Sequence, residues 1–170
     1  MLTNRFARVL ESLARHDVRF IVVGGVAAVL QRVPVNTQDF DIVHDRRPDN
    51  VERLLLALAE LDAVYRDDPR RLRPNESHLL GAGAQLLRTE RLDFDILGSI
   101  DDGKSYDDLL PDTDLIEVAG CAIRVLTLER LIEVKRKLTR PKDKFMLMHL
   151  EATLDERSRM RVGTGKRPTD

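Results

Sequence analysis

The spacing of apolar residues in the first part of the chain predicts helices and strands in alternation. Apolar positions recur every three or four residues over 4–15 and 48–62, as they do on one face of an amphipathic helix. Residues 18–23 form a β-branched run and residues 37–43 alternate polar with apolar, so both are predicted strands. A short helix over 26–31 is predicted between these two strands.

The rest of the chain continues this mixture with longer connections. Residues 66–76 are rich in charge and proline, which indicates an exposed connection, and residues 77–84 show no clear period. The other predicted elements are strands over 84–89 and 92–97, a short helix over 106–110, a hairpin of 115–118 with 122–126, and helices over 128–138 and 142–156. Residues 157–170 are mostly Arg, Lys, Gly and Pro, and we expect a disordered basic tail there.

This order of elements predicts the fold class. Alternating helices and strands indicate an α/β (α+β) domain with a mixed central sheet flanked by helices and with further helices at its C-terminal end. A chain of 170 residues is long enough to bury one core, so we expect a single domain over 1–156.

Composition and charge narrow the class of protein. The formal net charge of −1 gives no overall attraction to nucleic acid or to an anionic membrane. The single Cys121 excludes an intramolecular disulfide framework and a cysteine-based zinc cluster, and its apolar neighbours predict a buried thiol. The N-terminus lacks the apolar core of a signal peptide, and the longest apolar run, 20–30, is too short to span a bilayer. We therefore expect a cytoplasmic protein.

A glycine pair is the first candidate site feature. Gly24 and Gly25 end a predicted strand where a short helix begins, which leaves backbone N–H groups accessible with no side chain in the way. Such a turn suits a phosphate group, although many strand-to-helix turns use glycine only for its backbone freedom. Acidic residues on the next strand give this signal more weight.

Two of these acidic residues are Asp39 and Asp41. They are two positions apart, so their carboxylates share one face of the predicted strand, while Phe40 and Ile42 point into the core. Two neighbouring carboxylates repel each other unless a cation lies between them. Hard oxygen ligands beside a substrate phosphate suit Mg²⁺ or Mn²⁺. The alternative is a solvated strand face that carries two acids.

The string Asp-Phe-Asp-Ile occurs a second time on a later predicted strand, at 93–96. Three carboxylates from two neighbouring strands can hold two metal ions about 4 Å apart for phosphoryl chemistry. Asp95, nearest the exit of the strand, is the preferred third ligand, and Asp93 is the alternative.

These residues together resemble a known superfamily. Gly24-Gly25, then Thr37-x-Asp39-x-Asp41 and a later Asp95, are similar to the pattern of DNA polymerase beta-like nucleotidyltransferases. The segments 126–135 and 140–143 look like those of minimal nucleotidyltransferases, a group that includes AbiEii-type toxins of toxin–antitoxin pairs. The resemblance covers about 20–151 and implies the nucleotidyltransferase fold.

The resemblance also implies roles for individual residues. Asp39, Asp41 and Asp95 match the catalytic metal ligands, and the glycine pair and Thr37 match the triphosphate-binding turn. Two further residues on the C-terminal helices, Lys135 and Lys142, are candidates for nucleotide binding; the alternative for Lys135 is a solvated helix lysine, and Lys142 stands at the opening of the last helix. One departure concerns position 35, where many relatives carry arginine and this chain has Val35; Arg32 is the nearest substitute. His44 is expected to be a surface histidine.

The implied activity is metal-dependent transfer of a nucleoside monophosphate from an NTP to an acceptor hydroxyl, with release of pyrophosphate. The acceptor could be an RNA 3′ end, a protein or a small molecule. The alternative is a non-catalytic module that binds a nucleotide or a partner chain within a toxin–antitoxin pair.

Overall fold

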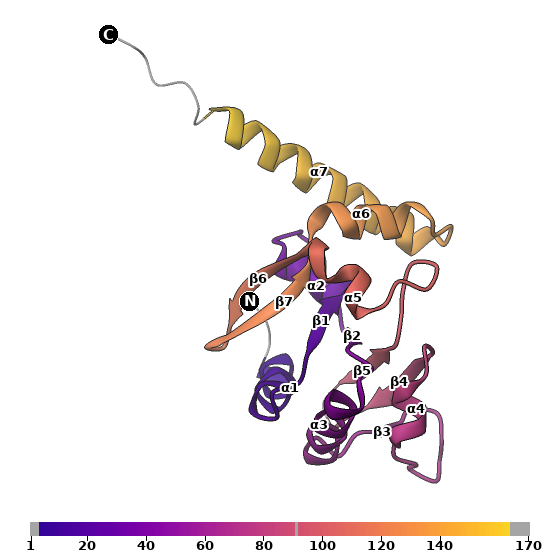
Figure 1. The fold of residues 1–170 in the computed structure, drawn as a ribbon. Helices are drawn as coiled ribbons and strands as arrows, with labels where there is room; N and C mark the ends of the chain where they lie inside the picture. Colours follow the sequence, from indigo (N-terminus) through magenta and orange to yellow (C-terminus); the bar gives the residue numbers. More distant parts are fainter. Residues whose placement is uncertain (1–3, 91, 164–170) are drawn as a thin grey trace.

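The computed structural model describes residues 4–90 and 92–163. Its centre is a mixed seven-stranded sheet in the order β3-β4-β5-β2-β1-β7-β6 (Figure 1). The strands are β1 Phe20–Val23, β2 Phe40–His44, β3 Val64–Tyr65, β4 Ala84–Arg88, β5 Asp93–Leu97, β6 Thr113–Val118 and β7 Cys121–Leu126. The helices are α1 Asn4–Arg15, α2 Gly24–Leu30, α3 Pro48–Glu60, α4 Glu76–Leu80, α5 Tyr106–Leu109, α6 Leu128–Arg136 and α7 Pro141–Gly163, with a 3₁₀ turn η1 at Leu110–Asp112. The expected mixed α/β architecture is confirmed.

The strand pairings place the acidic positions together. β2 runs antiparallel to β1 and parallel to β5, and β1 runs parallel to β7; the remaining neighbours are antiparallel. In the parallel pair, Asp41 of β2 stands opposite Asp95 of β5. Phe40 and Phe94 are fully buried with ring centroids 5.3 Å apart, and they fix the relative height of the two strands.

The helices cover the sheet through apolar faces that the sequence pattern predicts. All four residues of β1 are buried, because helices pack over both faces of this central strand. Helices α1 and α3 pack together, and the Ser12 hydroxyl donates a hydrogen bond to the Ala57 carbonyl at 3.3 Å. Thr127 caps α6, because its side chain accepts a hydrogen bond from the Arg130 backbone.

The C-terminal helix is longer than the sequence predicts. The expected disorder from residue 157 is wrong for residues 157–163, which continue α7; residues 164–170 lie outside the described part. The helix extends well away from the sheet in Figure 1. No proline interrupts it, and the Arg157 guanidinium bonds back to the carbonyl and side chain of Gln31. That contact holds α7 against the end of α2.

Three local expectations are corrected. His44 is not on the surface: it is 1% exposed, with its ring nitrogens 3.0 Å and 2.7 Å from the carbonyl oxygens of Leu97 and Leu79. The Cys121 thiol is partly exposed rather than buried, because it lies at the β6–β7 turn. The unassigned segment 77–84 contains most of α4, which the Asn75 side chain caps by accepting from the His78 backbone. Among the described helices, none is both long and apolar enough to cross a membrane.

Candidate active site

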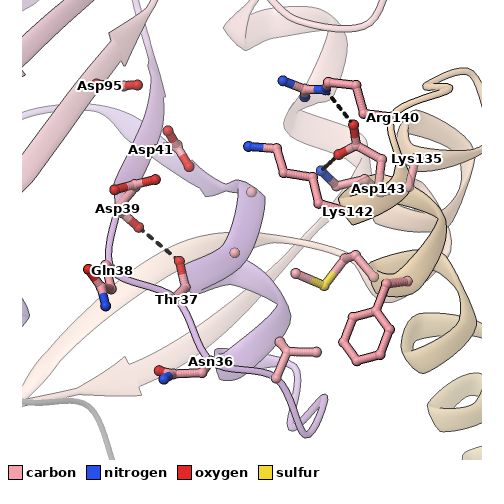
Figure 2. A pocket seen from close by; sticks show the side chains of 15 residues that line it. Asn36, Thr37, Gln38, Asp39, Asp41, Asp95, Lys135, Arg140, Lys142 and Asp143 are labelled. Atoms are coloured by element: carbon pink, nitrogen blue, oxygen red, sulfur yellow. Dashed lines mark hydrogen bonds and ion pairs between the residues drawn. The ribbon is translucent and has the colours of Figure 1, made fainter.

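A pocket of about 760 Å³ opens between the end of the β1–β2–β5 strands and the C-terminal helices. Its size lies within the range of small-molecule sites. One wall carries the glycine pair and the three carboxylates, and the other carries basic residues of α6 and α7 (Figure 2). The structure brings all eight candidate residues to this one pocket: Gly24, Gly25, Thr37, Asp39, Asp41, Asp95, Lys135 and Lys142.

The acidic wall is built from two strands and the loop before one of them. Asp41 is on β2 and Asp95 is on β5, whereas Asp39 is exposed in the loop that leads into β2. Figure 2 shows the carboxylates of Asp39 and Asp41 turned toward the same space. Asp95 lines this pocket, whereas Asp93 lines a neighbouring one that Asp39 also borders.

The charge on this wall is only partly balanced. Burial, together with the nearby charges of Asp95 and Asp39, raises the pKa of Asp41 to about 6. Burial is also the main reason why the pKa of Asp95 is raised. A carboxyl group with a raised pKa sits where additional positive charge is favourable, so the acidic wall can accept a cation.

The glycine pair makes room for the acidic wall. Gly24 has φ +65°, and a Cβ atom there would overlap the carboxylate of Asp41. A Cβ atom on Gly25 would overlap the Thr37 hydroxyl, which itself donates to the Asp39 carbonyl at 3.3 Å. No side chain of the described residues caps the start of α2, so its first N–H groups are left for other partners. Both glycines therefore leave room for a neighbouring side chain, and Gly24 in addition adopts a backbone conformation that other residues rarely take.

The basic wall is organised around one buried acid. Asp143 has a side chain only 1% exposed, and it accepts from Lys135 Nζ and Arg140 Nε, each at 2.7 Å. Burial opposes its ionisation, but these two hydrogen bonds hold the pKa of Asp143 below its usual range. Lys142 is exposed and extends across the pocket toward the carboxylates in Figure 2. Asp143 thus positions two cations of the basic wall.

One arginine behind the acidic wall was missed by the sequence analysis. Arg66 lies in the segment expected to be an exposed connection, yet its side chain is only 17% exposed. Its guanidinium contacts Asp95 at 2.5 Å and Asp93 at 3.1 Å. Asp93 also accepts from Arg88 at 2.7 Å. A charge-rich stretch without a period gave no signal that one of its arginines would be buried.

An apolar section completes the pocket. Val35, Phe145 and Met146 line it beside the basic wall, and the Phe145 side chain remains exposed at 60%. Asn36 also lines the pocket. The pocket thus combines an acidic section, a basic section and an apolar section.

The fit of a divalent cation depends on the donor set. Among residues 4–90 and 92–163, no three Asp, Glu, His or Cys side chains are as close together as the ligands of one ion. Asp39 and Asp41 nevertheless share one space, offer only oxygen donors, and carry negative charge that raises the pKa of Asp41. Carboxylates of this kind suit Mg²⁺, which commonly uses one or two of them and completes its shell with water and phosphate.

Comparison with known proteins places the fold. No family model matches the sequence, and no curated protein matches it either. A Thermotoga maritima protein assigned to the nucleotidyltransferases superposes with a TM-score of 0.54 and 19% identity over 98% of this chain and 97% of that one. The lincosamide antibiotic adenylyltransferase LnuA, solved with lincomycin bound, superposes with a TM-score of 0.61 and 13% identity over 89% of this chain and 98% of that one. ANT(2'')-Ia in complex with adenylyl-2''-tobramycin superposes with a TM-score of 0.56 and 14% identity over 95% of this chain and 97% of that one. The chain has the fold of these nucleotidyltransferases.

Proposed function

We propose that the protein is a metal-dependent nucleotidyltransferase that moves a nucleoside monophosphate from an NTP to an acceptor hydroxyl. The observation that carries the proposal is the pairing of Asp41 with Asp95 across two parallel strands, beside Asp39 and Gly24 and facing a basic wall. A solvated pair of acids would not need a glycine that clears space for one of them.

The residues divide the work of the reaction. The first turn of α2, with Lys142 and Lys135 opposite, would hold the triphosphate. A divalent cation, Mg²⁺ or Mn²⁺, on Asp39 and Asp41, with Asp95 as third carboxylate, would supply charge neutralisation at the phosphates. The acceptor oxygen bonds to the α-phosphorus, the bond from that phosphorus to the bridging oxygen breaks, and pyrophosphate leaves. The hydroxyl proton passes to Asp95, whose raised pKa favours a proton acceptor.

The apolar section suits the nucleoside. Phe145 presents an exposed ring at the pocket, with Met146 and Val35 beside it. Aromatic side chains bind nucleobases by stacking on their faces. Many relatives carry an arginine at position 35, and the nearest substitute in the sequence, Arg32, does not line the pocket. We therefore assign the electrostatic role of that arginine to Lys142, which extends toward the carboxylates from the opposite wall.

We propose a small hydroxylated molecule as the acceptor. Two of the structures with this fold, LnuA and ANT(2'')-Ia, were solved with an antibiotic or an adenylylated antibiotic bound, and this chain covers 98% and 97% of their chains. A net charge of −1 gives no general attraction to RNA. The toxin–antitoxin relationship rests on segments 126–135 and 140–143 alone, so a protein or RNA acceptor is kept as an arm of the test.

The test measures label transfer. The protein is incubated with each α-labelled NTP, Mg²⁺ or Mn²⁺, and a panel of aminoglycosides and lincosamides, with total RNA and lysate protein as separate arms. We expect label in a small-molecule product and no transfer by the Asp39→Ala/Asp41→Ala variant. Equal labelling by that variant would refute the enzymatic proposal, and label in RNA or protein alone would refute the acceptor class.

A further inference from the structure

Arg66 is fixed in place by the sheet before its side chain makes any contact. It directly follows β3, and its backbone N–H donates to the Leu86 carbonyl at 3.1 Å. Leu86 of β4 is in turn paired with Asp95 of β5. The guanidinium therefore reaches across β4 from a rigid backbone position to the third carboxylate of the proposed site.

The contact leaves one oxygen of Asp95 for the pocket. Arg66 Nη2 binds Asp95 Oδ1 at 2.5 Å, and Nη1 binds Asp93 Oδ2 at 3.1 Å. No hydrogen bond from the described residues goes to Asp95 Oδ2, while the side chain lines the pocket. Because a planar guanidinium holds two carboxylates at fixed angles, it restricts the rotation of Asp95.

The arrangement is not explained by local stability alone. The Nε atom of Arg66 is buried and has no hydrogen-bond partner among the described residues, which is unfavourable. Asp93 already has a cation in Arg88, at 2.7 Å, so Arg66 is not needed to neutralise it. Groups with such unsatisfied atoms occur often where a site requires a particular arrangement.

The arginines that contact the carboxylates neutralise only part of their charge. Asp39, Asp41, Asp93 and Asp95 carry four negative charges, and the two arginines that contact them carry two positive ones. This side of the pocket therefore keeps a net negative charge, which Lys135 and Lys142 face from the opposite wall. Without Arg66, the site would carry one more negative charge and would attract a cation more strongly.

We propose that Arg66 is a positioning residue of the nucleotidyl-transfer site: it turns Asp95 Oδ2 into the pocket and offsets the charge of Asp95. Arg66 therefore weakens the binding of the divalent cation while it increases the rate of transfer. This inference rests on the proposed function, and its two consequences have opposite signs. If Arg66 only supported the fold, its removal would weaken cation binding and also lower the rate of transfer.

The experiment measures Mn²⁺ affinity by electron paramagnetic resonance and transfer rate at saturating NTP and Mn²⁺. For Arg66→Met, we expect Mn²⁺ to bind about tenfold more tightly, as the loss of a neighbouring unit charge predicts. We expect the rate to fall about 100-fold, as small displacements of a reacting group commonly cause. Arg70→Met is the matched control, because Arg70 is 73% exposed and pairs with Asp68 outside the pocket; it should change neither quantity.

Arg66→Lys separates the two roles and tests the inference even when Arg66→Met does not fold. Lysine keeps the charge but cannot bridge two carboxylates in a fixed plane. We expect Mn²⁺ affinity within about twofold of the parent and a rate reduced about tenfold or more. A parent-like rate in Arg66→Lys, or weaker Mn²⁺ binding in a folded Arg66→Met, would overturn the inference. Failure of the parent to bind Mn²⁺ through Asp39 and Asp41 would instead overturn the proposed function.

Discussion

Asp41 and Asp95 stand at the same level of two adjacent parallel strands, each between buried apolar neighbours. Neighbouring strands lie about 4.8 Å apart, so two carboxylates in register repel each other strongly when both are ionised. Of the two, Asp95 has an arginine in direct contact, whereas the described residues place none against Asp41. Burial, followed by the charges of Asp95 and Asp39, raises the pKa of Asp41 to about 6. The site thus holds an acid whose charge the protein alone compensates poorly.

Asp41→Asn should stabilise the metal-free protein at neutral pH. A carboxyl whose pKa is about 6 when folded and near 4 when unfolded binds protons more tightly in the folded state. Its unfavourable contribution therefore develops as pH rises from about 4 to about 6 and persists above that range. Removing the charge should raise the free energy of unfolding at pH ~7.5 by up to about 3 kcal/mol and by little at pH ~4. Urea denaturation in EDTA measures both.

Asp93→Asn is the control for this prediction, because it should change the free energy of unfolding in the opposite direction. Hydrogen bonds from Arg88, ahead of those from Arg66, hold the pKa of Asp93 below its usual value. Its stabilising contribution is present above the unfolded pKa and is lost as pH falls, so Asp93→Asn should destabilise the protein at neutral pH. A gain in stability from both substitutions would show that the cause is general relief of negative charge.

Gly24→Ala should abolish metal binding in a folded protein. The backbone has φ +65°, and the added methyl group overlaps the carboxylate of Asp41. Gly120→Ala is a matched control, with φ +78° and no atom within 4 Å of the added Cβ. Both substitutions should cost about 1 kcal/mol of stability for the left-handed backbone, but only Gly24→Ala should displace Asp41. Calorimetric Mn²⁺ titration separates them, and equal Mn²⁺ affinities would contradict the prediction.

Asp143→Asn and Lys142→Met should distinguish a residue that positions the basic wall from one that contacts the NTP directly. Asp143 is buried and holds Lys135 and Arg140, so its neutralisation should cost about 1–3 kcal/mol and also weaken NTP binding. Lys142 is exposed, so its loss should weaken NTP binding several-fold with unchanged stability. Lys144→Met, an exposed change on the same helix outside the pocket, is the control. Parent-like NTP affinity in Lys142→Met would exclude it from the site.

Phe145→Ala should weaken the binding of all four NTPs by about tenfold, the loss expected when one stacking contact is removed. Its ring is 60% exposed, so the melting temperature should change little. Met148→Ala is matched to it, because Met148 is 63% exposed on the same helix and does not line the pocket. Inorganic triphosphate should bind Phe145→Ala and the parent equally. A loss of triphosphate affinity would show a general distortion rather than a missing stacking contact.

The acidic wall could be predicted from the sequence because local periodicity determines it. Alternation predicts that Asp39 and Asp41 share one side of a strand whose other side is core, although Asp39 lies in the loop just before β2; the repeated Asp-Phe-Asp-Ile string marks the strand that pairs with it. The glycine pair was also visible, since it stands at the end of a β-branched run. These features depend on neighbours that are close in the sequence.

The features that were missed depend on contacts between distant segments. The contact of Arg66 with Asp95 joins positions 29 residues apart, and neither flanking sequence has a period that signals it. His44 has a polar side chain at the end of a strand, and only the fold shows that two backbone carbonyls enclose it. The extended α7 was hidden by its composition, which is basic and poor in core residues but compatible with a helix that leaves the sheet.

The two walls of the pocket come from separate parts of the chain, the sheet and the C-terminal helices, and they carry opposite charge. An anion entering alone would be repelled by one side, and a bare cation by the other. A metal–triphosphate complex carries positive charge at the metal and negative charge on the phosphates. The pocket would therefore orient it, with the metal toward the acidic wall and the phosphates toward the basic wall, before any contact forms. Once bound, such a complex would contact the sheet and the C-terminal helices together, and so add to the contacts, such as that of Arg157 with Gln31, that already hold these helices in place.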